Sequence, residues 1–176
     1  YVWDLGVIDG APFAPTETLT YTVTGTDENG CENADLVIVT VSPLPDIDAG
    51  TDFEICIGDN AVLNGSGAGV GGSYVWDLGV VNGVPFTPGT VGTIDFTVTG
   101  TDGTSGCENT AVVSVTVHET PSVEANATTT EVCIGESVTL TGSGAASYTW
   151  TGGVVDGVSF TPGAIGSTTY TVTGTA

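Results

Sequence analysis

The chain of 176 residues contains no lysine and no arginine against 21 acidic residues, and its formal net charge is −21. Affinity for nucleic-acid phosphates depends on clustered lysine and arginine side chains, so we expect no nucleic-acid partner. The same absence argues against binding to an anionic membrane surface. Trypsin-like proteases, which cleave after lysine and arginine, would find no cleavage site, and this favours an exposed, extracellular protein. A general acidic bias of the proteome is the alternative explanation for the missing lysine and arginine.

Long apolar runs are also missing. No run approaches the roughly 20 residues that span a bilayer, and no basic region followed by an apolar stretch indicates a signal peptide. The sequence therefore predicts no direct membrane insertion.

The residue types of common catalytic sites are scarce. The chain has a single histidine, His118, in a stretch between two repeats, and we interpret it as a structural or surface residue. No distinctive pair of carboxylates suggests glycoside hydrolysis. Glycine falls in turns and never between a strand and a helix, where a phosphate-binding loop would lie. The sequence predicts neither an enzyme nor an organic cofactor.

What the chain does have is internal repetition. Residues 1–7 read Y-V-W-D-L-G-V, and the same letters return at 74–80. The three tryptophans, Trp3, Trp76 and Trp150, are spaced 73 and 74 residues apart, which gives a repeat of about 75 residues. We divide the chain into a first repeat at 1–44, the C-terminal part of a unit, a complete second repeat at 45–120, and a third repeat at 121–176, an N-terminal part that lacks its last strand.

Each repeat shows the pattern of short β-strands. Apolar and polar residues alternate at 137–142 (S-V-T-L-T-G) and at 112–118 (V-V-S-V-T-V-H), with β-branched residues throughout. Turn residues separate the strands at the spacing of a sandwich. The sequence predicts an all-β fold of seven-stranded antiparallel sandwiches. Proline-containing joints at 42–46 and 118–122 favour a stiff rod.

The four cysteines occur in two contexts, C-I-G at Cys56 and Cys133 and G-C-E-N at Cys31 and Cys107. We expect Cys56 to pair with Cys107 inside the second repeat. This bond would close a loop of about 50 residues, contribute on the order of 4 kcal/mol and imply an oxidising compartment. Cys31 and Cys133 would then have partners outside the chain or in a neighbouring subunit. A zinc site is the competing interpretation, but it usually needs closely spaced cysteine or histidine pairs.

Two groups of acidic residues suggest weak calcium binding through hard oxygen ligands, although neither has the spacing of an EF-hand. Acids solvated in turns are the alternative. The residues are Asp46, Asp48 and Asp52 near one joint, and Asp27, Glu28 and Glu32 at a turn.

Two further sets of residues complete the predictions. One tryptophan in each repeat, Trp3, Trp76 or Trp150, is expected at the centre of the core, with an exposed aromatic platform for sugars as the alternative. Asn64 and Asn126 match the acceptor pattern for N-glycosylation and should be exposed.

The sequence motifs of the chain resemble those of a known family of immunoglobulin-like domains. The stretch Y-V-W-D-L-G followed by a glycine turn is similar to the Y-x-W-D-F-G-D-G signature of polycystic-kidney-disease (PKD) type immunoglobulin-like domains. The wider order of C-I-G, G-S-G-A, Y-x-W, Y-T-V-T-G-T-D and G-C-E-N resembles tandem immunoglobulin-like repeats in giant secreted surface proteins of Bacteroidetes-type bacteria, many exported by the type IX system. The resemblance implies use as spacers, stalks, adhesins and filament building blocks.

Together these observations predict a structural extracellular protein at the cell surface. Its expected partners are further copies of the same repeat, in one chain or in neighbouring subunits, with divalent cations or glycans in addition. The incomplete repeats suggest either a stretch of a longer array or a subunit completed by strand donation. The alternative function is a carbohydrate-binding or spacer region of a secreted hydrolase.

Overall fold

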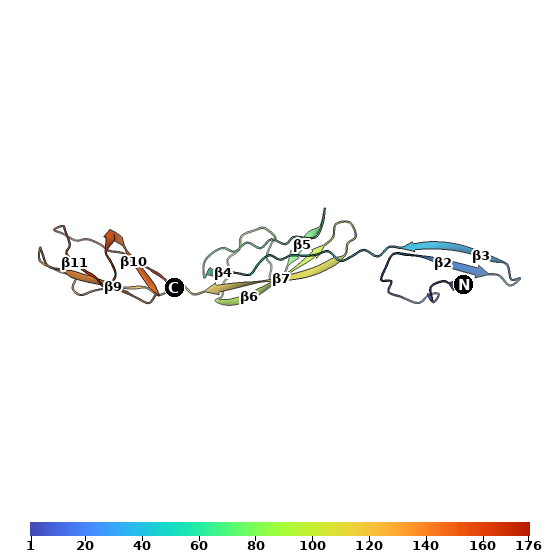
Figure 1. Ribbon diagram of the computed structural model, residues 1–176, viewed down its shortest axis with the longest axis horizontal. Coiled ribbons are helices and arrows are strands. Elements are labelled where there is room, and N and C mark those ends of the chain that lie inside the picture. Colours follow the sequence, from blue (N-terminus) through green and yellow to red (C-terminus); the bar gives the residue numbers. More distant parts are fainter. The chain divides into compact units, whose positions relative to one another are not determined.

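The structure, a computed structural model, describes all residues 1–176. It contains twelve strands and one short 3-10 turn, Thr151–Gly153, and no α-helix. The strands form four separate sheets (Figure 1). The predicted all-β class is therefore confirmed, and no helix in the chain could cross a bilayer.

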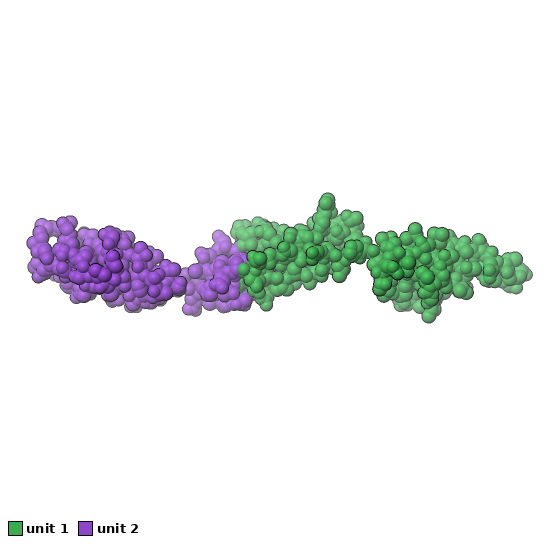
Figure 2. Space-filling view, in the orientation of Figure 1, with its two compact units in different colours: residues 1–52, 62–86, 95–115 green, residues 53–61, 87–94, 116–176 purple.

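The chain divides into two compact units (Figure 2). The first unit contains residues 1–52, 62–86 and 95–115, and the second contains residues 53–61, 87–94 and 116–176.

The first sheet has the order β1-β2-β3 and consists of β1 (Val2–Trp3), β2 (Leu19–Thr26) and β3 (Glu32–Val39). β2 and β3 pair antiparallel, from Leu19 opposite Val39 to Thr26 opposite Glu32. Tyr21 is buried, but Leu36, Val37 and Ile38 of β3 are exposed. Residues 1–44 contain no second sheet to cover them.

The second repeat contains a sheet with the order β4-β7-β6-β5. Its strands are β4 (Phe53–Cys56), β5 (Ser73–Trp76), β6 (Gly92–Thr101) and β7 (Glu108–His118). On β7 the side chains of Val113, Val115 and Val117 are buried, whereas the alternate residues are not. This alternation follows from the two-residue period of a strand and places the apolar side chains on one inner face.

β4 and β7 run in the same direction. The amide of Ser114 donates to Asp52 Oδ1 over 2.8 Å, just before β4 begins. The amide of Ile57, just after β4 ends, donates to the carbonyl of His118 over 2.8 Å. The C-terminal end of β4 therefore lies beside the C-terminal end of β7.

The third repeat has two sheets around a shared core. One sheet has the order β11-β9-β8, from β8 (Glu124–Ala127), β9 (Val138–Ser143) and β11 (Ser159–Phe160). The other pairs β10 (Ser147–Trp150) with β12 (Val172–Thr175). Val138, Leu140 and Trp150 are buried, with Phe160, Tyr170 and Val172 among the side chains packed against them. This arrangement is consistent with a β-sandwich.

A residue with a positive φ angle follows the tryptophan strand in every repeat. Leu5 and Leu78 have φ angles of 50° and 51°, in the left-handed region that L-residues avoid. Gly152 has φ of 72° at the equivalent place in the third repeat. Asp77 supports the turn of the second repeat, because its Oδ1 accepts a hydrogen bond from the amide of Thr97 over 3.0 Å.

Candidate functional site

Two of the three tryptophans, all predicted to lie at the centre of a core, are buried. Trp76 and Trp150 are 5% and 6% exposed, and Trp3 is partly exposed. Each indole Nε1 donates to the side-chain oxygen of the residue six positions later: Asp9 at 2.9 Å, Asn82 at 3.0 Å and Asp156 at 2.8 Å. Burial of Trp76 and Trp150 leaves neither indole face open for sugar stacking.

The oxygen that receives the indole also joins a distant segment. Asn82 Oδ1 accepts the amide of Gly65 over 2.6 Å, and Asp156 Oδ1 accepts the amide of Gly142 over 2.7 Å. Only one acceptor oxygen is needed for both bonds, so a carboxamide serves as well as a carboxylate. This requirement explains why asparagine can replace aspartate in the second repeat.

The G-C-E-N cysteines follow turns organised by aspartate. Asp27 Oδ1 accepts the amide of Cys31 over 2.8 Å, and the amide of Asp27 donates to the carbonyl of Cys31 over 3.0 Å. The backbone N–H of Cys31 is the main cause that lowers the pKa of Asp27, because it stabilises the carboxylate. In the second repeat the backbone N–H and then the hydroxyl of Ser105 lower the pKa of Asp102.

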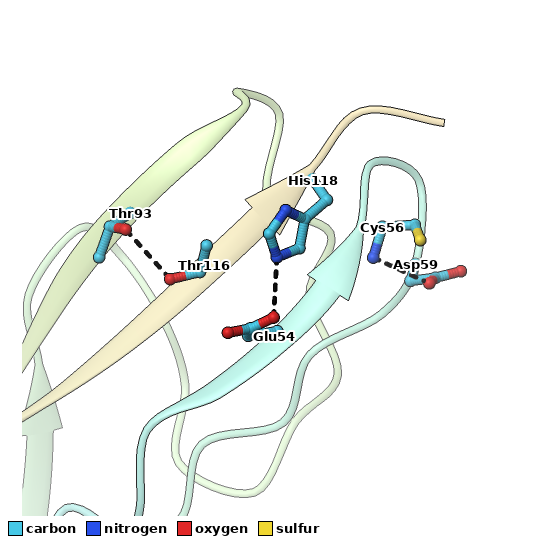
Figure 3. A network of polar contacts seen from close by, with 6 residues as sticks. All are labelled: Glu54, Cys56, Asp59, Thr93, Thr116 and His118. Atoms are coloured by element: carbon cyan, nitrogen blue, oxygen red, sulfur yellow. Dashed lines mark hydrogen bonds and ion pairs between the residues drawn. The ribbon is translucent and has the colours of Figure 1, made fainter. Parts of the chain in front are cut away.

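The C-I-G cysteines lie in a reciprocal turn. The amide of Cys56 donates to Asp59 Oδ2 over 3.2 Å, and the amide of Asp59 donates to the carbonyl of Cys56 over 3.1 Å (Figure 3). Cys133 and Glu136 form the same pair of bonds, at 2.9 and 3.0 Å. The backbone on both sides of each thiol is thus held in place.

The predicted pairing of Cys56 with Cys107 is not formed in the structure. All four cysteines carry free thiols. Cys107 precedes the first residue of β7, whereas Cys56 lies beside the last, His118. A strand of this length spans roughly 30 Å at about 3.3 Å per residue, and a disulfide requires Cα atoms within about 7 Å. The prediction placed both cysteines at one end of the sandwich, and β7 separates them.

The acidic residues proposed for calcium are not gathered into a site. No group of three or more histidine, cysteine, aspartate or glutamate side chains has a geometry that could hold a metal ion. Asp48 Oδ1 accepts the amide of Gly50, Asp52 Oδ1 that of Ser114, and Glu32 Oε1 the hydroxyl of Thr26. Only the contact of Asp48 is local in the chain; Asp52 bonds to a residue 62 positions away, and Glu32 bonds to the residue opposite it on β2. The other three residues of the predicted calcium set are exposed: Asp46, Asp27 and Glu28.

His118 lies at the surface, with its Nε2 atom 2.9 Å from Glu54 Oε2 (Figure 3). The two side chains are 55% and 72% exposed. Thr93 and Thr116 hydrogen bond to each other nearby over 3.0 Å. The contact joins β4 to the end of β7, and an exposed side-chain contact of this kind contributes little to stability.

Two surface features remain. Asn64 and Asn126 are exposed, as expected for glycan acceptors. The third repeat has a groove of about 1150 Å³ between residues 125–134 and residues 162–168. Its lining includes the apolar side chains of Val138, Leu140 and Trp150.

A comparison of the chain with known protein families finds no matching family, and a comparison with curated proteins finds no match.

Proposed function

We propose that the chain is a structural segment of an extracellular array of tandem immunoglobulin-like, PKD-like repeats that forms a stalk, adhesin or filament. The observation that carries the proposal is the recurrence of one scaffold contact in all three repeats. The indoles of Trp3, Trp76 and Trp150 each bond to a residue six positions later. Repetition of a scaffold contact, with no repeated reactive group beside it, is what a protein that works through length requires.

The distribution of charge supports this role. No polar or charged residue is buried, so the 21 acidic residues all lie at least partly at the surface. With no lysine or arginine, such a surface repels copies of itself and stays soluble in the open environment of a cell surface. Contacts between copies would then use β-strand edges, apolar side chains or bridging divalent cations.

The proposal can be tested on cells that produce the protein. Antibodies raised against residues 1–176 should label surface fibrils in electron micrographs, with an axial period of roughly 35 to 45 Å for one repeat. Antibody pre-incubated with excess chain is the control and should leave the fibrils unlabelled. Label confined to isolated globular particles would contradict the proposal.

A further inference from the structure

The two kinds of cysteine approach equivalent residues of the repeat. Ser42 and His118 occupy the same place, since each directly follows a T-V pair at the end of a G-C-E-N segment and precedes a proline joint. Cys107 Sγ lies 4.0 Å from the carbonyl oxygen of Ser42. The amide of Ile57, which follows Cys56, donates to the carbonyl oxygen of His118 over 2.8 Å. The two contacts involve different joints, one at each end of the second repeat.

The C-I-G cysteine is held beside the joint that follows its own repeat. The carbonyl carbon of Cys56 is bonded to the nitrogen of Ile57, so the Cα atom of Cys56 lies within about 5 Å of His118 O. Figure 3 shows Cys56 and His118 at the neighbouring ends of their strands. The Cys56 residue is exposed and remains accessible to a partner thiol.

The G-C-E-N cysteine is held beside the joint that precedes its repeat. Asn109, two residues after Cys107, donates from Nδ2 to the carbonyl of Pro45 over 2.9 Å. The turn before Cys107 is fixed by the bond from the amide of Asp102 to the carbonyl of Cys107, 2.9 Å. These bonds direct Cys107 towards Ser42, the last residue before Pro43.

We propose that the disulfides of this protein join successive repeats: the C-I-G cysteine of one repeat pairs with the G-C-E-N cysteine of the next, across the joint between them. The inference rests on the proposed array and specifies how its repeats are linked. Both positions then lie near one carbonyl, that of Ser42 or of His118; the two contacts bound the separation of the C-I-G Cα atom and the G-C-E-N Sγ atom at about 9 Å, and a disulfide requires the two Cα atoms within about 7 Å. No two of Cys31, Cys56, Cys107 and Cys133 belong to the same joint, which agrees with four free thiols in residues 1–176.

The bond forms by thiol–disulfide exchange. A thiolate of one cysteine attacks the disulfide of an oxidant such as oxidised glutathione, and the second thiolate displaces the bound thiol. One sulfur–sulfur bond is made in the protein, one is broken in the oxidant, and the two electrons and two protons leave as two molecules of reduced thiol.

The third repeat has a place for the strand that would carry the next G-C-E-N cysteine. In the second repeat β7 lies between β4 and β6. In the third repeat the segments equivalent to β4 and to the start of β6 border the open groove of about 1150 Å³. The apolar lining at Val138, Leu140 and Trp150 suits the buried valines of a strand like β7.

The decisive experiment extends the chain after Thr175 with a copy of residues 102–120, which supplies that strand and one further cysteine. The extended chain is refolded in a glutathione redox buffer, and its disulfides are mapped by mass spectrometry after digestion at acidic residues. We expect the appended cysteine to be linked to Cys56. A link to Cys133, or no link at all, would overturn the proposal.

Matched variants separate the two schemes. Cys56→Ser should leave the appended thiol free, whereas Cys133→Ser should leave its disulfide intact. The chain of 176 residues provides a second test that does not depend on folding of the extension: after the same oxidation its monomer should contain no Cys56–Cys107 link, and finding that link would overturn the proposal. A Cys56 link without fibrils on cells would contradict the proposed function alone.

Discussion

β3 in the first repeat and β7 in the second carry the same pattern, but their environments differ. Val113 and Val115 of β7 are 1% and 0% exposed, whereas Val37, which corresponds to Val113, is 46% exposed. In the second repeat the segment before β5 contributes the buried residues Ala61, Leu63 and Ala68, and Gly65 of this segment lies against Val98 of β6. Residues 1–44 contain no counterpart of that segment. The alternating pattern therefore specifies the strand but not its burial, which differs between the two repeats.

Truncating Leu63, a buried residue of the segment before β5, should have the largest effect on the stability of the second repeat. Leu63 is 2% exposed, so Leu63→Ala removes buried methyl groups and leaves a cavity, with an expected loss of about 3 kcal/mol in the free energy of unfolding. Amide hydrogen exchange of β7 should accelerate towards the rate of β3. The control is Val62→Ala, because Val62 is 42% exposed and should change stability by under about 0.5 kcal/mol. Equal effects of the two variants would contradict the assigned burial of Leu63.

Truncating the two equivalent valines tests the strands themselves. Val113→Ala should lower the free energy of unfolding of its repeat by about 2 kcal/mol, because the side chain is fully packed. Val37→Ala should cost under about 0.5 kcal/mol, since water already reaches that side chain. Urea denaturation followed by hydrogen exchange at individual amides distinguishes the repeats. A cost at Val37 as large as that at Val113 would show that β3 is covered in solution.

The side-chain oxygen that accepts the indole N–H of the tryptophan provides a third comparison, between Asn82 and its aspartate equivalents. Asn82→Ala leaves Trp76 Nε1 and the amide of Gly65 without their acceptor, which should cost about 1.5 kcal/mol. Asn82→Asp keeps the acceptor, as Asp156 does in the third repeat, and should change stability by under about 0.5 kcal/mol. Thermal unfolding followed by tryptophan fluorescence measures both variants. A loss of stability in Asn82→Asp equal to that in Asn82→Ala would show that the amide nitrogen also matters.

The fold class was predictable because the evidence for it is local. The alternation at 137–142 places β9 nearly where it lies, at Val138–Ser143, and the alternation at 112–118 coincides with the end of β7. Burial of Trp76 and Trp150 was predictable for a similar reason, since a large aromatic side chain in a strand of a small repeat belongs in its core. These features depend on residues close together in the chain.

The cysteine arrangement and the acidic groups were not predictable in this way. Periodicity identifies a strand but does not show which end of that strand lies beside a turn from elsewhere in the chain. Because β4 and β7 run in the same direction, Cys56 lies at the opposite end of β7 from Cys107. A cluster of acidic residues in the sequence likewise does not show which group each carboxylate contacts. Asp48 bonds to the amide of Gly50 two residues away and is turned to its own backbone.

The smallest expected effect concerns the turns before the G-C-E-N cysteines, where the carboxylates of Asp27 and Asp102 accept hydrogen bonds from different groups. Both have a lowered pKa in the folded chain, so each carboxylate stabilises its turn above the unfolded value near 3.9. That contribution is lost as the pH falls through the lower, folded pKa. In carbon-detected NMR titrations both carboxyl groups should titrate below that value, and in urea both should return to it.

Ser105→Ala sharpens this comparison, because Ser105 donates its hydroxyl to Asp102 Oδ1 over 2.7 Å and Asp27 has no hydroxyl donor. The variant should raise the pKa of Asp102 part of the way to its ordinary value, since the backbone donors at Thr104 and residue 105 remain. The pKa of Asp27 should not move. An unchanged titration of Asp102 would mean that water replaces the hydroxyl contact in the variant.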